Sequence, residues 1–396
     1  MAHRYRLYLE PDAETVLIRH CGDARFVWNL ALEQANLWRP GRRSTPGSTQ
    51  RMRQLAEARR NSWLGEGSSS VQQQALRDFD RALKHWWAKT HRRPRWRKAG
   101  INEGFCIRDV TVTKINRRWA TIAVPKCAPV RFRLSRPLPA DYGMARITLD
   151  RSGRWHISFA ASQPVVQRET TGMHIGIDLG VVATITTSAG DQHHSPTPAR
   201  SEAARLLRLQ RKLSRQDKGS NRRKQTKAKI ARLKARETDR RRDFIEKTTT
   251  ALVVRYDTIA IEDLQVKNMV RSAKGTSENP GRNVTAKAGL NRAIHSQGWA
   301  MFRRRLVDKA ATCGVTVLAV NPAHTSQRCA ACGHVSPENR KSQAVFACVA
   351  CEHHSNADVN AAINILAAGQ AVYRRGEDIR PPLGGILDEA STTLAA

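Results

Sequence analysis

The sequence predicts a multidomain α+β protein, and three patterns carry this prediction. Apolar residues recur at helical spacing in two early segments, 14–38 and 68–86. Short alternating segments between Phe105 and Phe159 predict a small antiparallel sheet or barrel. From residue 173 onwards, nearly continuous apolar strands alternate with helical segments, which indicates a second unit. A chain of 396 residues is long enough for two or three domains with a sizeable core.

The first half of the chain is expected to form a strand, two helices and a sheet. Residues 4–9 alternate as a short strand, and a helix is expected over 14–38. A loop rich in Pro, Gly, Ser and Thr follows, and the second helix starts after the serines at 68–70. The expected strands are 105–112, 118–124, 129–134, 145–150 and 155–161. Residues 162–172 lack periodicity and are expected to form a linker.

The second half begins with two strands over 173–190, joined by a tight turn at Asp178–Val181. A long helical hairpin is expected over 201–255, followed by a buried strand at 258–263. A polar loop at Gly275–Gly289 precedes a helix over 299–311 and another strand at 315–320. The chain ends in a Pro/Gly tail with PPLGG at 381–385, and this tail is expected to be disordered.

The charge of the chain points to a polyanionic partner. Lys and Arg number 68 against 34 acids, a net charge of +34. Neutralising phosphates releases counterions, so nucleic acid is the favoured partner. An anionic membrane is disfavoured, because the basic residues are spread over several segments and no apolar run approaches ~20 residues. With no apolar stretch at the N-terminus, a cytoplasmic, nucleoid-associated protein is expected.

The helical hairpin is the most basic part of the chain. Between Arg205 and Lys247 there are 18 Lys or Arg and 5 acids, a local net charge of +13. A solvated helix face is the ordinary interpretation of a charge run. Here, however, the basic residues outnumber the acids too far for ion pairs within the segment to balance them. Contact with a phosphate backbone is therefore expected, with Arg222, Arg223 and Lys224 as candidates.

Four of the eight cysteines form two pairs with two residues inside each, Cys329 with Cys332 and Cys348 with Cys351. Fifteen residues separate the pairs, a spacing typical of a two-knuckle zinc ribbon. Four thiolates would close a tetrahedral structural Zn²⁺ site with no position left for water. A redox dithiol is the weaker alternative. The other four cysteines are scattered along the chain, which argues against a disulfide scaffold.

Three acids stand at positions where a ligand could reach them. Asp178 and Glu262 each end a strand of the doubly buried kind, and Asp358 opens an apolar helix. Three converging carboxylates could hold two Mg²⁺ ions for phosphodiester hydrolysis. Each acid also has an ordinary interpretation: a turn residue at 178, one of a surface pair at 262–263, and a helix-dipole acid at 358.

Together these motifs resemble a known family. GIDLG around Asp178, IAIEDL around Glu262, and NPAHTSQRCAACG with CVACEHHSNADVNAAINI around Asp358 resemble the split RuvC-type nuclease of transposon-encoded TnpB proteins, relatives of compact type V CRISPR nucleases. The likeness covers about residues 4–370, and Glu352 departs from it where the family often has Gly. It implies RNA-guided cleavage of double-stranded DNA next to a short transposon-adjacent motif, catalysed by Asp178, Glu262 and Asp358 with Mg²⁺.

The resemblance also implies a domain organisation. A wedge β-barrel would comprise 1–10 and 96–165 and carry a helical recognition lobe at 11–95. An RNase H-like (RuvC) core with a mixed sheet would comprise 171–324 and 355–371, interrupted by a zinc-ribbon insertion at 325–354 that binds target nucleic acid, and 372–396 would be a flexible tail. The implied partners are a guide RNA from the transposon end and target double-stranded DNA, bound by a monomeric protein with one RNA and no membrane.

Two segments of the N-terminal part are further candidates for nucleic-acid contact. Gln72, Gln73 and Gln74 could pair with adenine in the major groove, although ordinary polar-face residues are the simpler interpretation. Arg95 and Trp96 lie in HRRPRWRKAG, where a ring among cations could stack on a base. A solvated basic turn with Trp96 in the core is the alternative.

Two other functions share much of this pattern. A DNA transposase would use the same two-metal chemistry but needs a domain for its DNA ends, and the sequence shows no clear helix-turn-helix. A nuclease-inactive RNA-guided DNA-binding regulator would explain the charge, but the intact acids argue against it.

Overall fold

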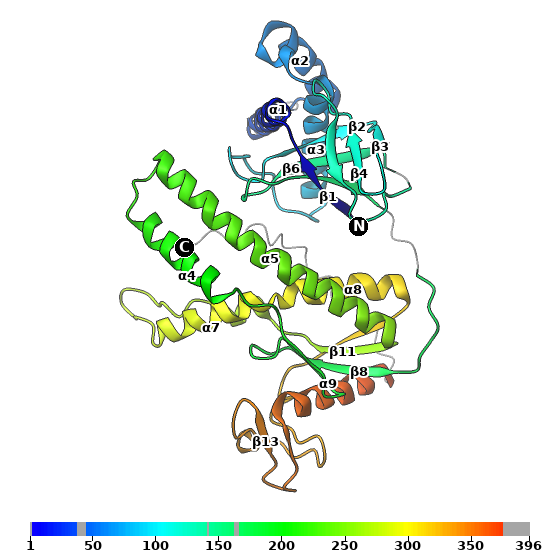
Figure 1. Ribbon diagram of the computed structural model, residues 1–396, viewed down its shortest axis with the longest axis vertical. Coiled ribbons are helices and arrows are strands. Elements are labelled where there is room, and N and C mark those ends of the chain that lie inside the picture. Colours follow the sequence, from blue (N-terminus) through cyan, green and yellow to red (C-terminus); the bar gives the residue numbers. More distant parts are fainter. Residues whose placement is uncertain (1, 38–44, 141, 162–165, 375–396) are drawn as a thin grey trace. The chain divides into compact units, whose positions relative to one another are not determined.

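The computed structural model describes residues 2–37, 45–140, 142–161 and 166–374 (Figure 1). The chain divides into two compact units, one of Met1–Gln163 with Ala204–Ala235 and one of Pro164–Ala203 with Arg236–Ala396. Among the described residues, no helix has both the length and the apolar character that crossing a membrane requires.

The first unit contains helices α1 (Pro11–Asn36), α2 (Ser48–Asn61) and α3 (Ser69–Trp87), with a 3₁₀ turn, η1 (Trp63–Glu66). The expected helices over 14–38 and after Ser68 are confirmed as α1 and α3. The Ser68 hydroxyl accepts from the N–H of Val71 and caps α3. Helix α2 was not predicted, because its apolar face is short. Met52, Leu55 and Ala58 pack on the core, and an ion pair between Arg51 and Asp80 of α3 adds to this contact.

The sheet of this unit has seven antiparallel strands in the order β2-β6-β7-β1-β5-β4-β3. The strands are β1 (Ala2–Tyr8), β2 (Gly104–Arg108), β3 (Val112–Lys114), β4 (Trp119–Ile122), β5 (Val130–Arg133), β6 (Met144–Leu149) and β7 (Trp155–Ala160). The segment expected as one strand at 105–112 splits into two where Asp109 adopts a φ of 52°. The expected antiparallel sheet is confirmed. In the described residues it forms a half-barrel that does not close, because β2 and β3 are its two edges.

The second unit is built on a mixed five-stranded sheet in the order β10-β9-β8-β11-β12. Strands β8 (His174–Asp178), β11 (Thr258–Glu262) and β12 (Thr316–Val320) are parallel, and β9 (Ile185–Thr187) and β10 (Gln192–His193) continue the sheet antiparallel. The parallel strands confirm the expected buried strands. A small hairpin of β13 (Val345–Ala347) and β14 (His354–Asn356) follows η2 (Pro337–Asn339).

Helices α4 (Arg200–Ser214) and α5 (Asn221–Arg255) confirm the expected hairpin. They are followed by α6 (Val266–Met269), α7 (Val284–Gln297), α8 (Trp299–Cys313) and α9 (Ala357–Arg374). The predicted loop Gly275–Gly289 is wrong in its second half, because α7 starts at Val284. Of the predicted tail at 372–396, the first three residues continue α9, and 375–396 lie outside the described residues.

Side-chain alternation divides the parallel strands between two cores. Ile175, Ile177, Ile259 and Ile261 pack with apolar residues of α5 and α8 on one face of the sheet. On the other face Ala260, Leu318 and Val320 pack against Ile365 of α9. Strand β11 is therefore buried along its whole length, as its continuous apolar sequence predicts.

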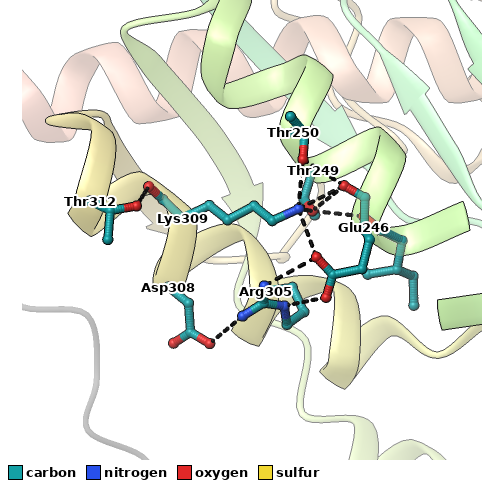
Figure 2. Close-up of polar contacts among 8 residues, drawn as sticks. Glu246, Thr249, Thr250, Arg305, Asp308, Lys309 and Thr312 are labelled. Carbon is teal, nitrogen blue, oxygen red and sulfur yellow. Dashed lines mark hydrogen bonds and ion pairs between the residues drawn. The ribbon is translucent and has the colours of Figure 1, made fainter. Parts of the chain in front are cut away.

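A polar network joins α5 to α8 inside the second unit (Figure 2). The Glu246 carboxylate of α5 accepts two hydrogen bonds from Arg305, at 2.6 and 3.1 Å, and lies 2.9 Å from the ammonium of Lys309. Lys309 also donates to the hydroxyls of Thr249 and Thr250. Burial alone would raise the pKa of Glu246, but the hydrogen bonds from Arg305 and Lys309 outweigh it and lower the pKa to about 2.

This network should stabilise the second unit in a pH-dependent way. A carboxylate with a depressed pKa contributes stability above its ordinary pKa of 4.5 and loses it as the pH falls toward 2. Since Glu246 is half exposed, we expect Glu246→Gln to lower the free energy of unfolding by about 1 kcal/mol at pH 7. In denaturant unfolding, the difference from wild type should stay constant down to pH 4.5 and shrink below it.

Asp243→Asn is the matched control, because Asp243 lies on the same helix in an exposed pair with Lys247. We expect no measurable change for this variant. Equal losses in the two variants would contradict a special contribution from Glu246.

Candidate functional site

Two of the three predicted acids are brought together by the register of the parallel strands. Ile177 of β8 lies opposite Ile261 of β11, so the next residues, Asp178 and Glu262, are neighbours at the carboxyl ends of both strands. Alternation places both acids on the sheet face that α9 covers, together with Gly176 and Ala260. Glu262 is buried and Asp178 is partly buried.

The third acid reaches this place from the first turn of α9. The Asn356 side chain caps the helix by accepting from the N–H groups of Asp358 and Val359 at 3.0 and 3.2 Å. Asp358 is buried beside the loop that follows β8: a Cβ built on Gly180 would lie 3.9 Å from its Oδ2. The structure thus places Asp178, Glu262 and Asp358 at one end of the sheet.

The acids influence one another electrostatically. The pKa of Asp178 is raised to about 7 by burial and by the nearby carboxylates of Glu262 and Asp358. Burial also raises the pKa values of Glu262 and Asp358. Several carboxylates that repel one another in a partly dry site favour a cation between them.

Arg340 supplies a positive charge at this place. Its Nη2 donates to Oδ1 of Asp358 at 3.2 Å, and its charge lowers the pKa values of all three acids against the effect of burial. Thr325 orients the second acid by donating from Oγ1 to Oε1 of Glu262 at 2.5 Å. Both residues were missed from the sequence, because each reaches the acids from a segment without regular periodicity.

The loop after Asp178 is fixed by another residue that the sequence did not reveal. The Gln297 amide at the end of α7 donates to the carbonyl of Val181 at 2.9 Å, and its Oε1 accepts from the hydroxyl of Thr184 at 2.5 Å. One side chain therefore ties both arms of the loop that connects Asp178 to β9. A glutamine in a helix carries no sequence signal for such a role.

The four predicted cysteines also converge. Their sulfur atoms all lie within 4.8 Å of one another, with 3.7 Å between Cys329 and Cys351 and 3.6 Å between Cys332 and Cys348. A tetrahedral ion with metal–sulfur bonds of about 2.3 Å requires sulfur separations of about 3.8 Å. The four-cysteine cluster therefore fits structural zinc. Among the described residues, the carboxylate oxygens of the three acids do not all lie within 4.8 Å of one another.

Each cysteine pair lies on a tight backbone turn. The N–H of Gly333 donates to the carbonyl of Cys329, and the N–H of Glu352 donates to that of Cys348. Gly333 has a φ of 78° and Glu352 a φ of 58°. Glycine adopts this left-handed conformation freely, whereas another residue loses roughly 1 kcal/mol. Glu352 thus adopts a glycine-like conformation at the point where the sequence departs from the family pattern.

Asparagines connect the cysteine cluster to the acids. Asn360 of α9 accepts from the N–H of Ala330 and donates to the carbonyl of Arg328, at 2.9 and 2.7 Å. Asn364, one turn later, donates to the carbonyls of Thr325 and Arg328. Both are buried, so the first knuckle and Thr325 are fixed to the helix that carries Asp358.

The glutamine candidates divide between the surface and the interior. Gln72 is buried and donates to Asp23 and to the carbonyl of Leu64. Gln74 is also buried, and its amide donates to Asp78. Gln74 is therefore not accessible to a base in this structure, and it does not lie on a solvated polar face either. Gln73 is exposed and stays a candidate.

The basic candidates are mostly accessible. Arg95 is exposed and Trp96 is 50% exposed, which excludes the alternative that Trp96 belongs to the core. Arg222 and Lys224 are exposed on α5. Arg223 donates instead to the carbonyls of Leu213 and Gln216, where it closes the turn between α4 and α5. Whether these side chains contact nucleic acid stays a prediction.

Comparison with curated proteins identifies relatives along nearly the whole chain. It is 39% identical over 388 residues to the Escherichia coli (strain K12) protein named "Putative RNA-guided DNA endonuclease InsQ", covering 96% of this chain and 94% of the relative. The chain belongs to the TnpB (IS605 OrfB) family. A second TnpB-family relative, from Streptomyces pristinaespiralis, is 33% identical over 387 residues, covering 96% of this chain and 92% of the relative, and is named "Putative RNA-guided DNA endonuclease".

Three family models match parts of this TnpB-family chain. They are described as "Probable transposase" (156–273), "Cas12f1-like, TNB domain" (299–365) and "Helix-turn-helix domain" (1–41). The last description contrasts with the sequence analysis, which found no clear helix-turn-helix. Over the described part of 1–41 the structure has β1 and one continuous helix, α1. A solved Cas12f1-sgRNA-target DNA complex aligns with 92% of this chain and 98% of its own at 12% identity and a TM-score of 0.49.

The cysteine geometry yields a prediction about metal content. We expect the purified protein to carry about one zinc per chain, and Cys329→Ser to lose the zinc and much of its solubility, because three thiolates leave the site open. Elemental analysis measures the ratio. Cys313→Ser, which removes a cysteine outside the cluster, should keep the metal. Absence of zinc from the wild-type protein would refute the assignment.

Proposed function

We propose that this chain is an RNA-guided endonuclease that cleaves double-stranded DNA next to a short transposon-adjacent motif. The observation that carries the proposal is the convergence of Asp178, Glu262 and Asp358 on one end of a mixed sheet. Membership of the TnpB family supports it, since two relatives of nearly full length are named as RNA-guided DNA endonucleases. Under this proposal the second unit is an RNase H-like (RuvC) nuclease core.

The donor set fits divalent magnesium. Carboxylate oxygens are its preferred protein ligands, and the raised pKa of Asp178 reflects a repulsion that a cation would relieve. Asp178, Glu262 and Asp358 would hold the metal. When bound, Mg²⁺ ions would activate the attacking water and stabilise the leaving oxygen of the phosphodiester.

The neighbouring residues have distinct roles in this proposal. Thr325 restricts Glu262 to one orientation through its hydroxyl, so that one carboxylate oxygen is left to the metal. Arg340 offsets the negative charge of the acids and holds Asp358. Its guanidinium could also contact a phosphate that approaches the acids, since arginine matches phosphate oxygens with paired donors. The zinc ribbon would position Arg340.

The nucleic-acid partners would be a guide RNA from the transposon end and target double-stranded DNA. Sequence reading would be delegated to base pairing, while the protein contacts backbones. The excess of positive charge on α4 and α5 suits this role, with Arg222 and Lys224 accessible. Gln73, Arg95 and Trp96 are the remaining accessible candidates in the first unit.

A DNA transposase is the second candidate, because a family model described as "Probable transposase" matches residues 156–273. A transposase would join a cut donor end to a new strand, whereas the proposed nuclease would leave free ends. A strand-transfer assay with donor ends distinguishes them. Cleavage guided by the co-purifying RNA, without joining, supports the proposed function.

Removing any one acid should abolish cleavage without affecting RNA binding. We expect Asp178→Ala, Glu262→Ala and Asp358→Ala each to lower the rate of Mg²⁺-dependent cleavage roughly 100-fold or more, because each removes a metal ligand. Asp263→Ala is the matched control: it removes the next acid along the chain, which pairs with Arg303, and should keep activity. Full cleavage by any of the three variants would exclude the assignment.

Arg340 should matter for cleavage more than for binding. We expect Arg340→Ala to slow single-turnover cleavage at saturating DNA, and Arg340→Lys to recover part of the rate, because lysine keeps the charge but not the paired donors. Lys341→Ala removes the adjacent exposed cation and should behave as wild type. Equal rates for wild type and Arg340→Ala would rule out this role.

A further inference from the structure

A hollow of about 590 Å³ lies on the outer face of the seven-stranded sheet. Its lining comprises Arg6, Tyr8, Arg118, Arg133, Leu134 and Ser135. The lining therefore contains three arginines and no acid. All of these side chains belong to the first unit, whereas the acids and the cysteine cluster belong to the second.

The strand register creates this concentration of charge. Tyr8 of β1 lies opposite Arg131 of β5, and Trp119 of β4 lies opposite Arg133. Continuing the β1–β5 register by one pair places Arg6 beside Arg133. Like charges directly opposite each other on adjacent strands destabilise a sheet. An anion bound between them would remove this repulsion.

In the part of the chain that the structure describes, no acid pairs with the arginines at this face. None of the ion pairs among the described residues includes Arg6, Arg118, Arg131 or Arg133. A second hollow of this unit, of about 480 Å³, provides a contrast. There Arg19 pairs with Glu66 and Arg25 pairs with Glu103. The hollow on the sheet face, in contrast, has positive charge that no acid in its lining balances.

Aromatic rings lie among these cations. The Arg6 guanidinium lies 5.3 Å from the centre of the Tyr8 ring, and that of Arg131 lies 4.9 Å from the Trp119 ring. The two rings meet edge to face at 5.0 Å. Tyr8 is 40% exposed. Ring and guanidinium planes that alternate in this way offer stacking surfaces for an unpaired base, with cations beside them for its phosphates.

We propose that this face, formed by Arg6, Tyr8, Arg118, Trp119, Arg131 and Arg133, binds an unpaired segment of RNA. The arginines contact consecutive phosphates, and a base stacks beside Tyr8. A duplex does not fit this chemistry, because its bases are already stacked on one another. The inference rests on the proposed function in one respect: the guide RNA is the partner expected to present unpaired nucleotides to the protein.

Photo-crosslinking to the full-length chain tests the position of the contact. A 4-thiouridine-containing oligo(U) should crosslink to peptides of β1 or β4 that contain Tyr8 or Trp119. Unlabelled oligo(U) should compete, and duplex DNA should not. Crosslinks confined to other segments, or competition by duplex DNA as effective as that by oligo(U), would overturn the proposal. Preferential crosslinking of oligo(dT) at this face would indicate that it binds displaced single-stranded DNA instead of RNA. That result would also overturn the proposal.

The salt dependence of binding tests the chemistry. In Arg6→Ala/Arg118→Ala/Arg133→Ala, the slope of log affinity for oligo(U) against log salt should become shallower by about 2, since each single-strand phosphate contact contributes about 0.7. Tyr8→Ala should weaken oligo(U) binding roughly tenfold, and Tyr8→Phe should not. The control removes three exposed arginines of the same unit, Arg53, Arg60 and Arg77, and should leave the slope unchanged.

Equal slope changes in the two triple variants would show a general effect of charge and overturn the proposal. If Arg6→Ala/Arg118→Ala/Arg133→Ala kept the wild-type affinity for oligo(U) and the wild-type salt slope, the proposal would also be overturned. These assays need neither DNA cleavage nor metal. Loss of cleavage in the Asp178 variant is a separate outcome, so failure of this site and failure of the proposed nuclease can be distinguished.

Discussion

The close approach of α9 to the central strands is the constraint on which the candidate site depends. A Cβ at Gly176 of β8 would lie 2.1 Å from the carbonyl oxygen of Ala362, and one at Gly369 of α9 would lie 2.6 Å from Cβ of Ala260. Real Cβ atoms do not approach so closely, so only glycine allows this contact at both points along the helix. Because the helix packs directly on the sheet, its first turn places Asp358 beside the ends of β8 and β11.

The same helix joins the acids to the cysteine cluster. Asn360 and Asn364 use buried amides to bind the backbone between Thr325 and Ala330, and Thr325 in turn bonds to Glu262. Buried polar groups of this kind are costly unless every partner is present, so the knuckle, the helix and the strand end stabilise one another. A structural metal at the cysteines would therefore influence the acids through packing and hydrogen bonds, without taking part in their chemistry.

Much of this arrangement could be predicted from the sequence, because its signals are periodic or regularly spaced. The doubly buried strands, the basic hairpin and the paired cysteines each have such a pattern. The pattern of helix α2 is weak, since only Met52, Leu55 and Ala58 pack on the core and an Arg51–Asp80 ion pair adds to their contact. Gln74 lies in a run of three polar residues, yet tertiary packing buries its side chain. Arg340, Thr325 and Gln297 act through contacts across 18 to 116 residues of sequence, which no local pattern encodes.

The central claim is that Asp178, Glu262 and Asp358 form one divalent-cation site. Anomalous scattering from crystals of the full chain with its RNA, soaked in Mn²⁺, tests it most directly. We expect two manganese peaks roughly 4 Å apart, bounded by these three carboxylates and lost in Asp178→Ala crystals. Manganese bound only elsewhere, with the three carboxylates free of metal in well-ordered density, would contradict it.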